Sequence, residues 1–91
     1  MAVTVKIPTQ LRSATHGDAE TSVAGDTVGG VLDALYERYD ELRDRITDDG
    51  SQLRRFVNVY VDGEDIRFLE GLDTPVPDGS EVTILPAVAG G

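Results

Sequence analysis

Residues 28–46 read VGGVLDALYERYDELRDRI. The apolar residues of this stretch recur at steps of one, three or four positions, and they are Val28, Val31, Leu32, Leu35, Tyr39, Leu42 and Ile46. Such spacing is typical of a helix that packs one apolar face on a core. Asp26 or Thr27 is expected to cap the first turn, because a side-chain oxygen there can accept a hydrogen bond from an unpaired amide. We therefore predict one main helix over residues 27–47.

Strand patterns flank this helix on both sides. Val3, Val5 and Ile7 alternate with polar residues at a period of two, which is typical of a half-buried strand. The predicted strands cover residues 3–7, 20–23, 56–61, 66–68 and 81–86. The predicted turns lie at residues 16–18, 62–63 and 77–79. Each turn places glycine beside aspartate, and these residue types tolerate the positive φ angles of tight turns.

The predicted order of elements is strand, strand, helix, strand, strand, strand. The 19 residues from 28 to 46 would form a helix about 28 Å long, which is enough to cross one face of a small sheet. A helix between two hairpin-like units predicts an α+β fold of the β-grasp type, with a mixed sheet of four or five strands. We expect residues 1–86 to form this single domain and residues 87–91 to form a flexible C-terminal tail.

Composition limits the function. The 91 residues include 8 Lys and Arg against 17 Asp and Glu, a net charge of −9, and no cysteine. The absence of cysteine excludes disulfides, thiolate-bound metals and a thiol nucleophile. The negative charge argues against nucleic acid or membrane partners, because both need clustered Lys and Arg. No apolar run approaches the roughly 20 residues of a membrane span, and no signal-peptide pattern is present, so we expect a cytoplasmic location.

The C-terminal residues are small and end in two glycines. They are Pro86, Ala87, Val88, Ala89, Gly90 and Gly91. One interpretation is a frayed end without a role. The other is that the α-carboxylate of Gly91 reacts, with Gly90 as its unhindered neighbour and the preceding residues as a spacer. A carboxylate is a poor electrophile, so this second interpretation requires a partner that activates it as an acyl phosphate or acyl adenylate.

Three segments support the second interpretation. They read RFVNVYVDGEDIR (residues 55–67), PDGSEV (77–82) and ILPAVAGG (84–91). With the predicted order of elements, they resemble the MoaD/ThiS family of ubiquitin-like sulfur carriers over essentially the whole chain, and the CysO type most closely. The resemblance implies a ubiquitin-like β-grasp and a modification at Gly91.

The resemblance also implies partners. An E1-like adenylyltransferase/sulfurtransferase would use ATP and magnesium to adenylylate Gly91, and sulfur would then displace AMP to leave a thiocarboxylate. The chain would be a substrate and not an enzyme, with no bound cofactor or metal. A sulfur-accepting synthase would consume the thiocarboxylate, and the CysO type favours cysteine synthesis from O-phosphoserine, with a metalloprotease releasing the product. A carrier shared by several synthases, including one for a thiosugar, stays open.

Two other functions remain open. A ubiquitin-like modifier would join Gly91 to lysines of other proteins, although the single lysine, Lys6, gives little scope for chains of linked copies. A non-catalytic acidic binding module would act through its folded surface and would not need the two terminal glycines. The acidic surface is explained by solubility, or by docking to a basic groove on an activating enzyme. Tyr60 and Phe68, on the sheet face opposite the helix, are candidates for such a contact.

Three further groups of residues carry weaker signals. Residues 25–30 read GDTVGG, which suggests a phosphate cradle before a helix but lacks the Gly-Lys-Ser/Thr ending of a P-loop. His16 is expected to be a surface loop residue. The carboxylates of Asp62, Glu64 and Asp65 lie close in sequence, but their spacing is not that of a calcium loop.

Overall fold

The computed structural model describes residues 2–47 and 57–86. The strands are β1 (Ala2–Lys6), β2 (Glu20–Ala24), β3 (Val57–Val61), β4 (Glu64–Asp65) and β5 (Glu81–Pro86). The α-helices are α1 (Val28–Arg38) and α2 (Asp40–Ile46), and three short 3-10 helices are η1 (Thr9–Thr15), η2 (Ile66–Phe68) and η3 (Gly71–Asp73).

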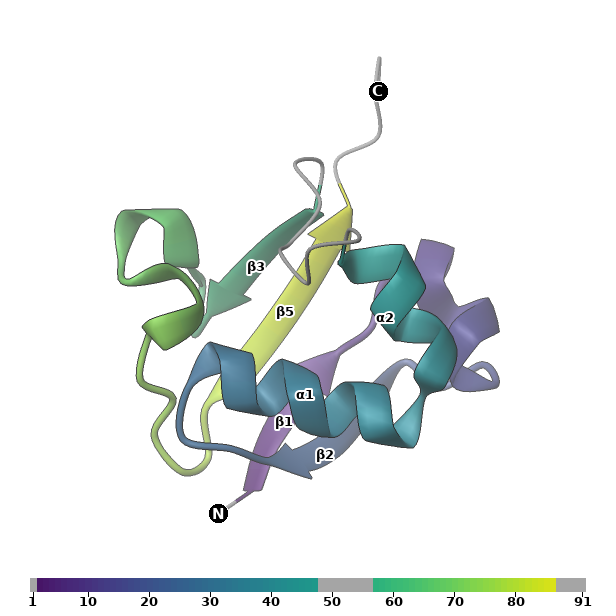
Figure 1. Cartoon of the computed structure of the whole chain (residues 1–91), viewed down its shortest axis with the longest axis horizontal. Coiled ribbons are helices and arrows are strands. Elements are labelled where there is room, and N and C mark those ends of the chain that lie inside the picture. Colours follow the sequence, from purple (N-terminus) through teal and green to yellow (C-terminus); the bar gives the residue numbers. More distant parts are fainter. Residues whose placement is uncertain (1, 48–56, 87–91) are drawn as a thin grey trace.

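The strands form one five-stranded mixed sheet in the order β2-β1-β5-β3-β4. β1 and β5 run parallel, and the other neighbouring pairs are antiparallel. The two α-helices cover one face of this sheet (Figure 1). This arrangement confirms the predicted α+β β-grasp with a mixed sheet. It also places β5 in the centre, between a parallel and an antiparallel neighbour.

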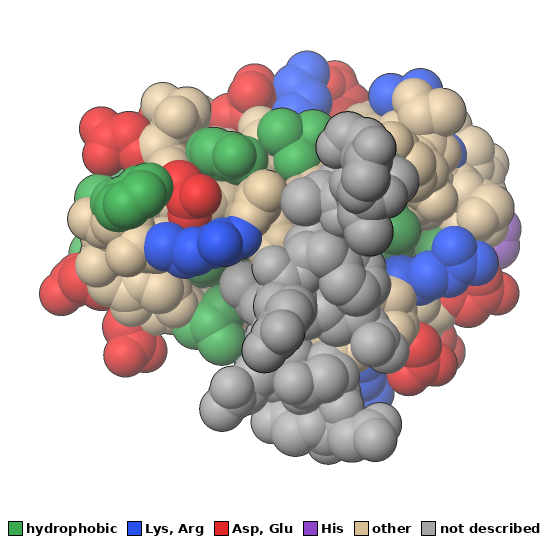
Figure 2. Space-filling view, turned by 90° about the horizontal axis from the view of Figure 1, so that it is seen from above, with side chains coloured by type: hydrophobic (Ala, Val, Ile, Leu, Met, Phe, Trp, Pro, Cys, Tyr) green, Lys and Arg blue, Asp and Glu red, His purple; other side chains and the backbone are tan. Residues whose placement is uncertain are grey.

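Charged side chains are distributed over the surface. Figure 2 shows Asp and Glu side chains around the visible face, with Lys and Arg side chains between them. The net charge of −9 is therefore not gathered into a single acidic patch on this face. Mixed charges of this kind favour solubility and do not by themselves mark a binding site.

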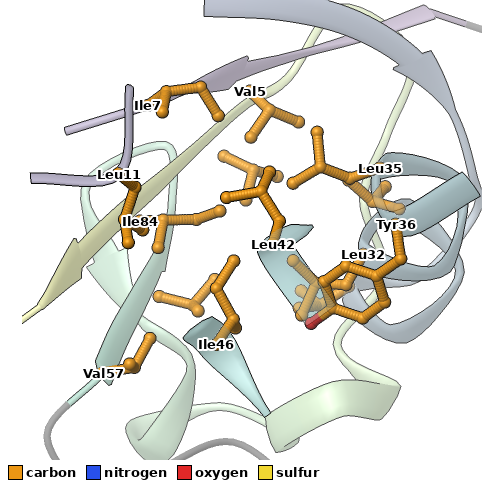
Figure 3. Close-up of a cluster of buried hydrophobic side chains, with 14 of the residues drawn as sticks. Val5, Ile7, Leu11, Leu32, Leu35, Tyr36, Leu42, Ile46, Val57 and Ile84 are labelled. Atoms are coloured by element: carbon orange, nitrogen blue, oxygen red, sulfur yellow. The ribbon is translucent and has the colours of Figure 1, made fainter. Parts of the chain in front are cut away.

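The core lies between the sheet and the helices. Val5, Leu35, Leu42, Ile46 and Ile84 are completely buried, and Figure 3 shows them pointing toward one another from β1, α1, α2 and β5. The alternation predicted for the first strand is confirmed, because its apolar residues are all buried. The predicted helix face is confirmed as well, since every apolar residue of the stripe is buried. Burying apolar surface in this way supplies most of the driving force for folding.

The predicted single helix over residues 27–47 is interrupted at Tyr39. Its backbone is extended, with φ −135° and ψ 90°, so α1 ends and α2 begins on either side of it. The Tyr39 hydroxyl donates a hydrogen bond to Asp18 Oδ2 at 2.8 Å. The change of direction lets α2 pack against η1 while Leu42 and Ile46 stay in the core. Of the two predicted caps, Thr27 is the one that caps α1. Its side chain accepts a hydrogen bond from Gly30 N at 3.1 Å.

The predicted strand over residues 66–68 is wrong. The returning strand is β4, because the Asp62-Gly63 turn has positive φ at both residues and places Glu64 directly opposite Val61. Asp65 Oδ1 then accepts a hydrogen bond from Arg67 N at 2.9 Å, which starts the 3-10 turn of η2. The predicted turn at residues 77–79 is confirmed, with Ser80 N donating to Pro77 O at 3.0 Å.

No helix among the described residues is long and apolar enough to cross a membrane.

Two buried tyrosines give a matched test of the helix packing. Tyr39→Phe removes the hydrogen bond to Asp18, and we expect it to lower the free energy of unfolding by about 1–2 kcal/mol. The Tyr36 hydroxyl has no hydrogen-bond partner among the described residues, so Tyr36→Phe should leave the free energy of unfolding unchanged or raise it. Urea unfolding followed by circular dichroism measures both values. Equal losses in the two variants would contradict this difference in hydrogen bonding.

Candidate functional site

The candidate site follows the end of β5. Pro86 is the last described residue, and its Cα pairs with that of Val57 in β3. The predicted reactive Gly91 and its neighbours Gly90, Ala89, Val88 and Ala87 lie outside the described residues. Their role therefore stays a prediction, and so does the flexible tail over residues 87–91.

At the C-terminal end of β5, this strand extends beyond its neighbour β1. β1 ends at Lys6, which pairs with Thr83, whereas β5 continues to Pro86 with β3 alone beside it. The chain leaves β1 through Pro8 and enters η1. The first half of β5 is paired with strands on both sides. A central strand of this kind resists local unfolding, so the residues that follow it start from a well-ordered position. Figure 1 shows that β5 ends at the opposite end of the sheet from the start of β1.

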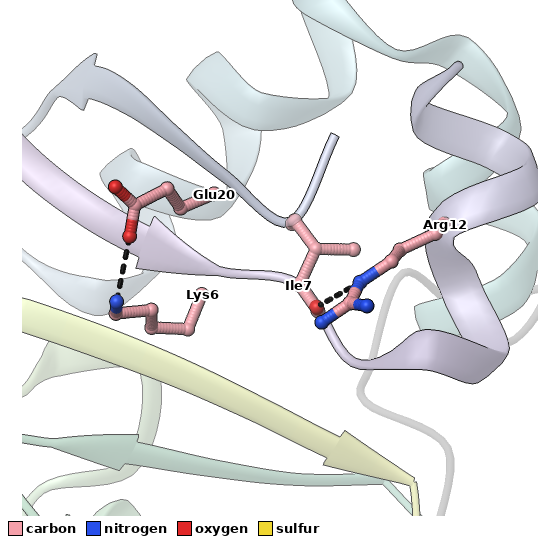
Figure 4. A network of polar contacts seen from close by, with 4 residues as sticks. All are labelled: Lys6, Ile7, Arg12 and Glu20. Atoms are coloured by element: carbon pink, nitrogen blue, oxygen red, sulfur yellow. Dashed lines mark hydrogen bonds and ion pairs between the residues drawn. The ribbon is translucent and has the colours of Figure 1, made fainter. Parts of the chain in front are cut away.

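The sheet face opposite the helices is largely polar near its centre. Lys6, Thr83 and Tyr60 lie side by side on it, because they pair across β1, β5 and β3 and alternate with buried residues. Lys6 Nζ and Glu20 Oε2 are 2.6 Å apart (Figure 4), and the hydrogen bond and negative charge of Glu20 raise the pKa of this lysine. Tyr60 therefore lies on the predicted face.

Phe68 lies elsewhere than predicted. It belongs to η2 and not to a strand of the sheet, and 86% of its surface is exposed. The expectation that it lies within a strand on the open sheet face is wrong, because the strand ends at Asp65 and the chain turns there. A strand would place Ile66 and Phe68 on the same face, whereas Ile66 is buried and Phe68 is exposed.

The GDTVGG segment does not offer a free phosphate cradle. Gly30 N donates to the Thr27 side chain, and Val28 N donates to Thr74 O at 3.0 Å. Phosphate sites at helix N-termini need such amides unpaired. Gly25 has a packing role instead, because a Cβ atom there would lie 2.7 Å from Val31 N.

The remaining candidates have structural roles. His16 is exposed and adopts φ 58°, at the end of η1. Asp62 Oδ1 accepts a hydrogen bond from Glu81 N at 2.9 Å, and Asp65 caps η2, so these carboxylates fix turns. Within residues 2–47 and 57–86, no group of three or more His, Cys, Asp or Glu side chains is placed to hold a metal ion.

Comparison with known families also covers residues that lie outside the described part of the structure. The model of the ThiS family matches residues 5–91, which include Gly90 and Gly91. The chain belongs to the ThiS family. This membership confirms the resemblance found in the three sequence segments.

Individual relatives of this ThiS-family chain are similar over its full length. It is 52% identical to the sulfur carrier protein CysO of Mycobacterium tuberculosis, with the whole of both chains covered. Its structure resembles a chain of the BexX/CysO complex from Amycolatopsis orientalis, with a TM-score of 0.90, 46% identity, and 98% and 99% of the two chains covered. It also resembles small archaeal modifier protein 1 of Methanosarcina acetivorans, with a TM-score of 0.88, 36% identity, and 99% and 96% covered.

Proposed function

We propose that this ThiS-family chain is a sulfur carrier whose reactive group is the C-terminal carboxylate of Gly91. The observation that supports this most directly is the 52% identity to a sulfur carrier protein over the whole chain. The family match extends through Gly91 itself. The chain also has no cysteine, so no thiol is available to hold sulfur elsewhere.

The proposed chemistry has two steps. A carboxylate oxygen of Gly91 attacks the α-phosphorus of ATP and releases pyrophosphate, which leaves an acyl adenylate. A sulfide-equivalent nucleophile then attacks the acyl carbon, the C–O bond to AMP breaks, and AMP leaves with the electron pair. The product is a thiocarboxylate, in which sulfur replaces one oxygen. This activation turns a poor electrophile into one with a good leaving group.

The partner would supply the catalytic groups for both steps. We expect this partner to be an E1-like adenylyltransferase/sulfurtransferase that uses ATP and magnesium, and the chain to act as its substrate without a cofactor of its own. Glycine at the reacting position lets the partner's backbone approach closely, because glycine lacks a Cβ atom. Since the proposed activation consumes ATP, we expect the carrier to act in the cytoplasm.

The proposed sulfur acceptor is a synthase that makes cysteine from O-phosphoserine, with a metalloprotease to release the product. The similarity to CysO proteins favours this assignment. The similarity to a chain of the BexX/CysO complex supports a direct protein partner. A carrier shared by several synthases would use the same reactive group.

A ubiquitin-like modifier is the second candidate function. The similarity to small archaeal modifier protein 1 favours it. It requires isopeptide bonds between Gly91 and lysines of target proteins, and these adducts distinguish it from a carrier.

Intact mass spectrometry tests the proposed function. After incubation with ATP, magnesium, a sulfide source and the E1-like enzyme of the same organism, we expect the chain to gain about 16 Da from the exchange of oxygen for sulfur. Fragmentation must place the gain on Gly91, because oxidation of Met1 adds nearly the same mass. A chain that gains neither AMP nor sulfur from a demonstrably active enzyme would contradict the proposal.

A further inference from the structure

Three large apolar side chains are exposed within five residues of one another. Phe68 is 86% exposed, Leu69 is 41% exposed and Leu72 is 36% exposed. Phe68 is the last residue of η2, Leu69 follows it, and Leu72 lies in η3. η2 and η3 contact each other, and η2 directly follows β4 at the edge of the sheet. Single exposed apolar residues are ordinary, but adjacent ones around an aromatic ring are typical of a protein contact. We refer to these three residues as the Phe68 patch.

Hydrogen bonds hold the backbone under the patch. Thr74 Oγ1 accepts from Glu70 N at 3.0 Å and donates to Gly71 O at 2.7 Å. Asp65 caps the first turn through Arg67 N. Ile66 is 2% exposed and anchors the segment in the core. The patch is therefore presented on a fixed backbone, which lowers the entropy that binding would otherwise cost.

The surroundings of the patch are acidic. Glu64, Glu70 and Asp73 are exposed. Residues 64–73 contain four carboxylates and one guanidinium, that of Arg67. Arg67 Nε lies 3.8 Å from Asp65 Oδ1. Figure 2 shows exposed hydrophobic side chains bordered by acidic and basic ones to the left of the grey atoms. An apolar pocket edged by Lys and Arg would complement this surface in shape and charge.

The patch and the tail lie within reach of one partner. β4 pairs with Tyr60, and Tyr60 pairs with Thr83 of β5. Pro86 is three residues further along β5, a distance of about 10 Å along an extended strand. The tail offers only small, uncharged side chains after Pro86. Selective recognition must therefore come mainly from the folded surface.

We propose that the Phe68 patch docks in an apolar, basic-edged pocket of the enzyme that activates Gly91. This inference rests on the proposed function and adds the surface by which that enzyme recognises the carrier. The patch supplies affinity and the acidic rim supplies rapid encounter, whereas the tail supplies the reacting atom.

Steady-state adenylylation kinetics test the docking surface. We expect Phe68→Ala and Leu72→Ala each to raise the KM for the carrier, by at least about tenfold for Phe68→Ala, with kcat unchanged. Phe68 is almost fully exposed, so its substitution leaves the core intact, and thermal unfolding checks this. The double variant Glu70→Gln/Asp73→Asn should also raise the KM and weaken its dependence on salt.

A matched pair on the outer face of the helices provides the control. Glu37→Gln/Glu41→Gln makes the same change in net charge at exposed positions of α1 and α2, and its KM should stay near the wild-type value. An unchanged KM for Phe68→Ala, or an equal rise in both double variants, would overturn the docking surface. Wild-type self-association that Phe68→Ala abolishes would overturn it in favour of a second copy. A wild-type chain that accepts no AMP from an active enzyme would remove the proposed function and this inference together.

Discussion

Adding a single residue after Gly91 is expected to reduce adenylylation by at least about a thousandfold. Each added residue moves the terminal carboxylate by up to about 3.6 Å. A displacement of even about 1 Å from the reacting geometry can lower a rate by about a hundredfold. Gly91→Pro should act similarly, because its ring fixes φ and fills the space in which the partner's backbone would approach. Mass spectrometry of the adenylate, with radiolabelled ATP for low yields, measures the loss.

The folded domain should be unchanged in the extended chain. Pro86 is the last β5 residue whose pairing with β3 is described, and the extension begins after Gly91, further along the chain. As the control, the circular dichroism spectrum and the thermal unfolding of the extended chain are compared with those of the wild type and should match them. An extended chain that carries AMP at its new C-terminus would show that the position of Gly91 does not matter. Full biological activity after deletion of Gly90 and Gly91 would instead support a binding module.

The main elements of the fold could be predicted from local sequence patterns. The alternation of Val3, Val5 and Ile7 predicts β1 because a strand places every second side chain on one face. Asp62-Gly63 predicts the hairpin after β3 because its positive φ angles are a local property of those residue types. Both features depend on neighbouring residues alone.

The interruption of the helix at Tyr39 could not be predicted in the same way. The apolar spacing through Tyr39 is that of a continuous helix, and the residue is buried as the spacing requires. What distinguishes it is the hydrogen bond to Asp18, 21 positions earlier in the chain. A contact between distant residues overrides the local helical preference there.

The candidate site likewise has one part that could be predicted from the sequence and one that could not. Gly91 could be proposed from the sequence, because the three segments that resemble one family include the diglycine end. Phe68 could be named as a candidate contact, but its place in the fold could not be predicted, because residues 66–68 have the pattern of a strand and the Asp65 side chain instead starts a 3-10 turn. The grouping of Phe68 with Leu69 and Leu72 depends on η2 and η3, so it required the structure.

The largest effect on stability is expected from Gly25→Ala, which should lower the free energy of unfolding by about 2–4 kcal/mol. A Cβ atom at this position would lie 2.7 Å from Val31 N and 2.9 Å from Val31 Cα, both backbone atoms of α1. Val31 is completely buried, so relief of the clash requires moving the first turn of the helix off the core. Urea unfolding measures the change.

Gly30→Ala provides the matched comparison, because the same methyl group is added five residues later. A Cβ atom at Gly30 would lie 3.5 Å from Thr27 Oγ1, an ordinary contact, and the position is exposed. Alanine favours helix over glycine by about 0.5–1 kcal/mol, so this variant should be more stable than the wild type. The two substitutions should change the free energy of unfolding in opposite directions, because α1 packs directly on Gly25 whereas Gly30 is open to solvent. Equal destabilisation by both substitutions would show that the segment needs glycine for backbone freedom and not for this close approach.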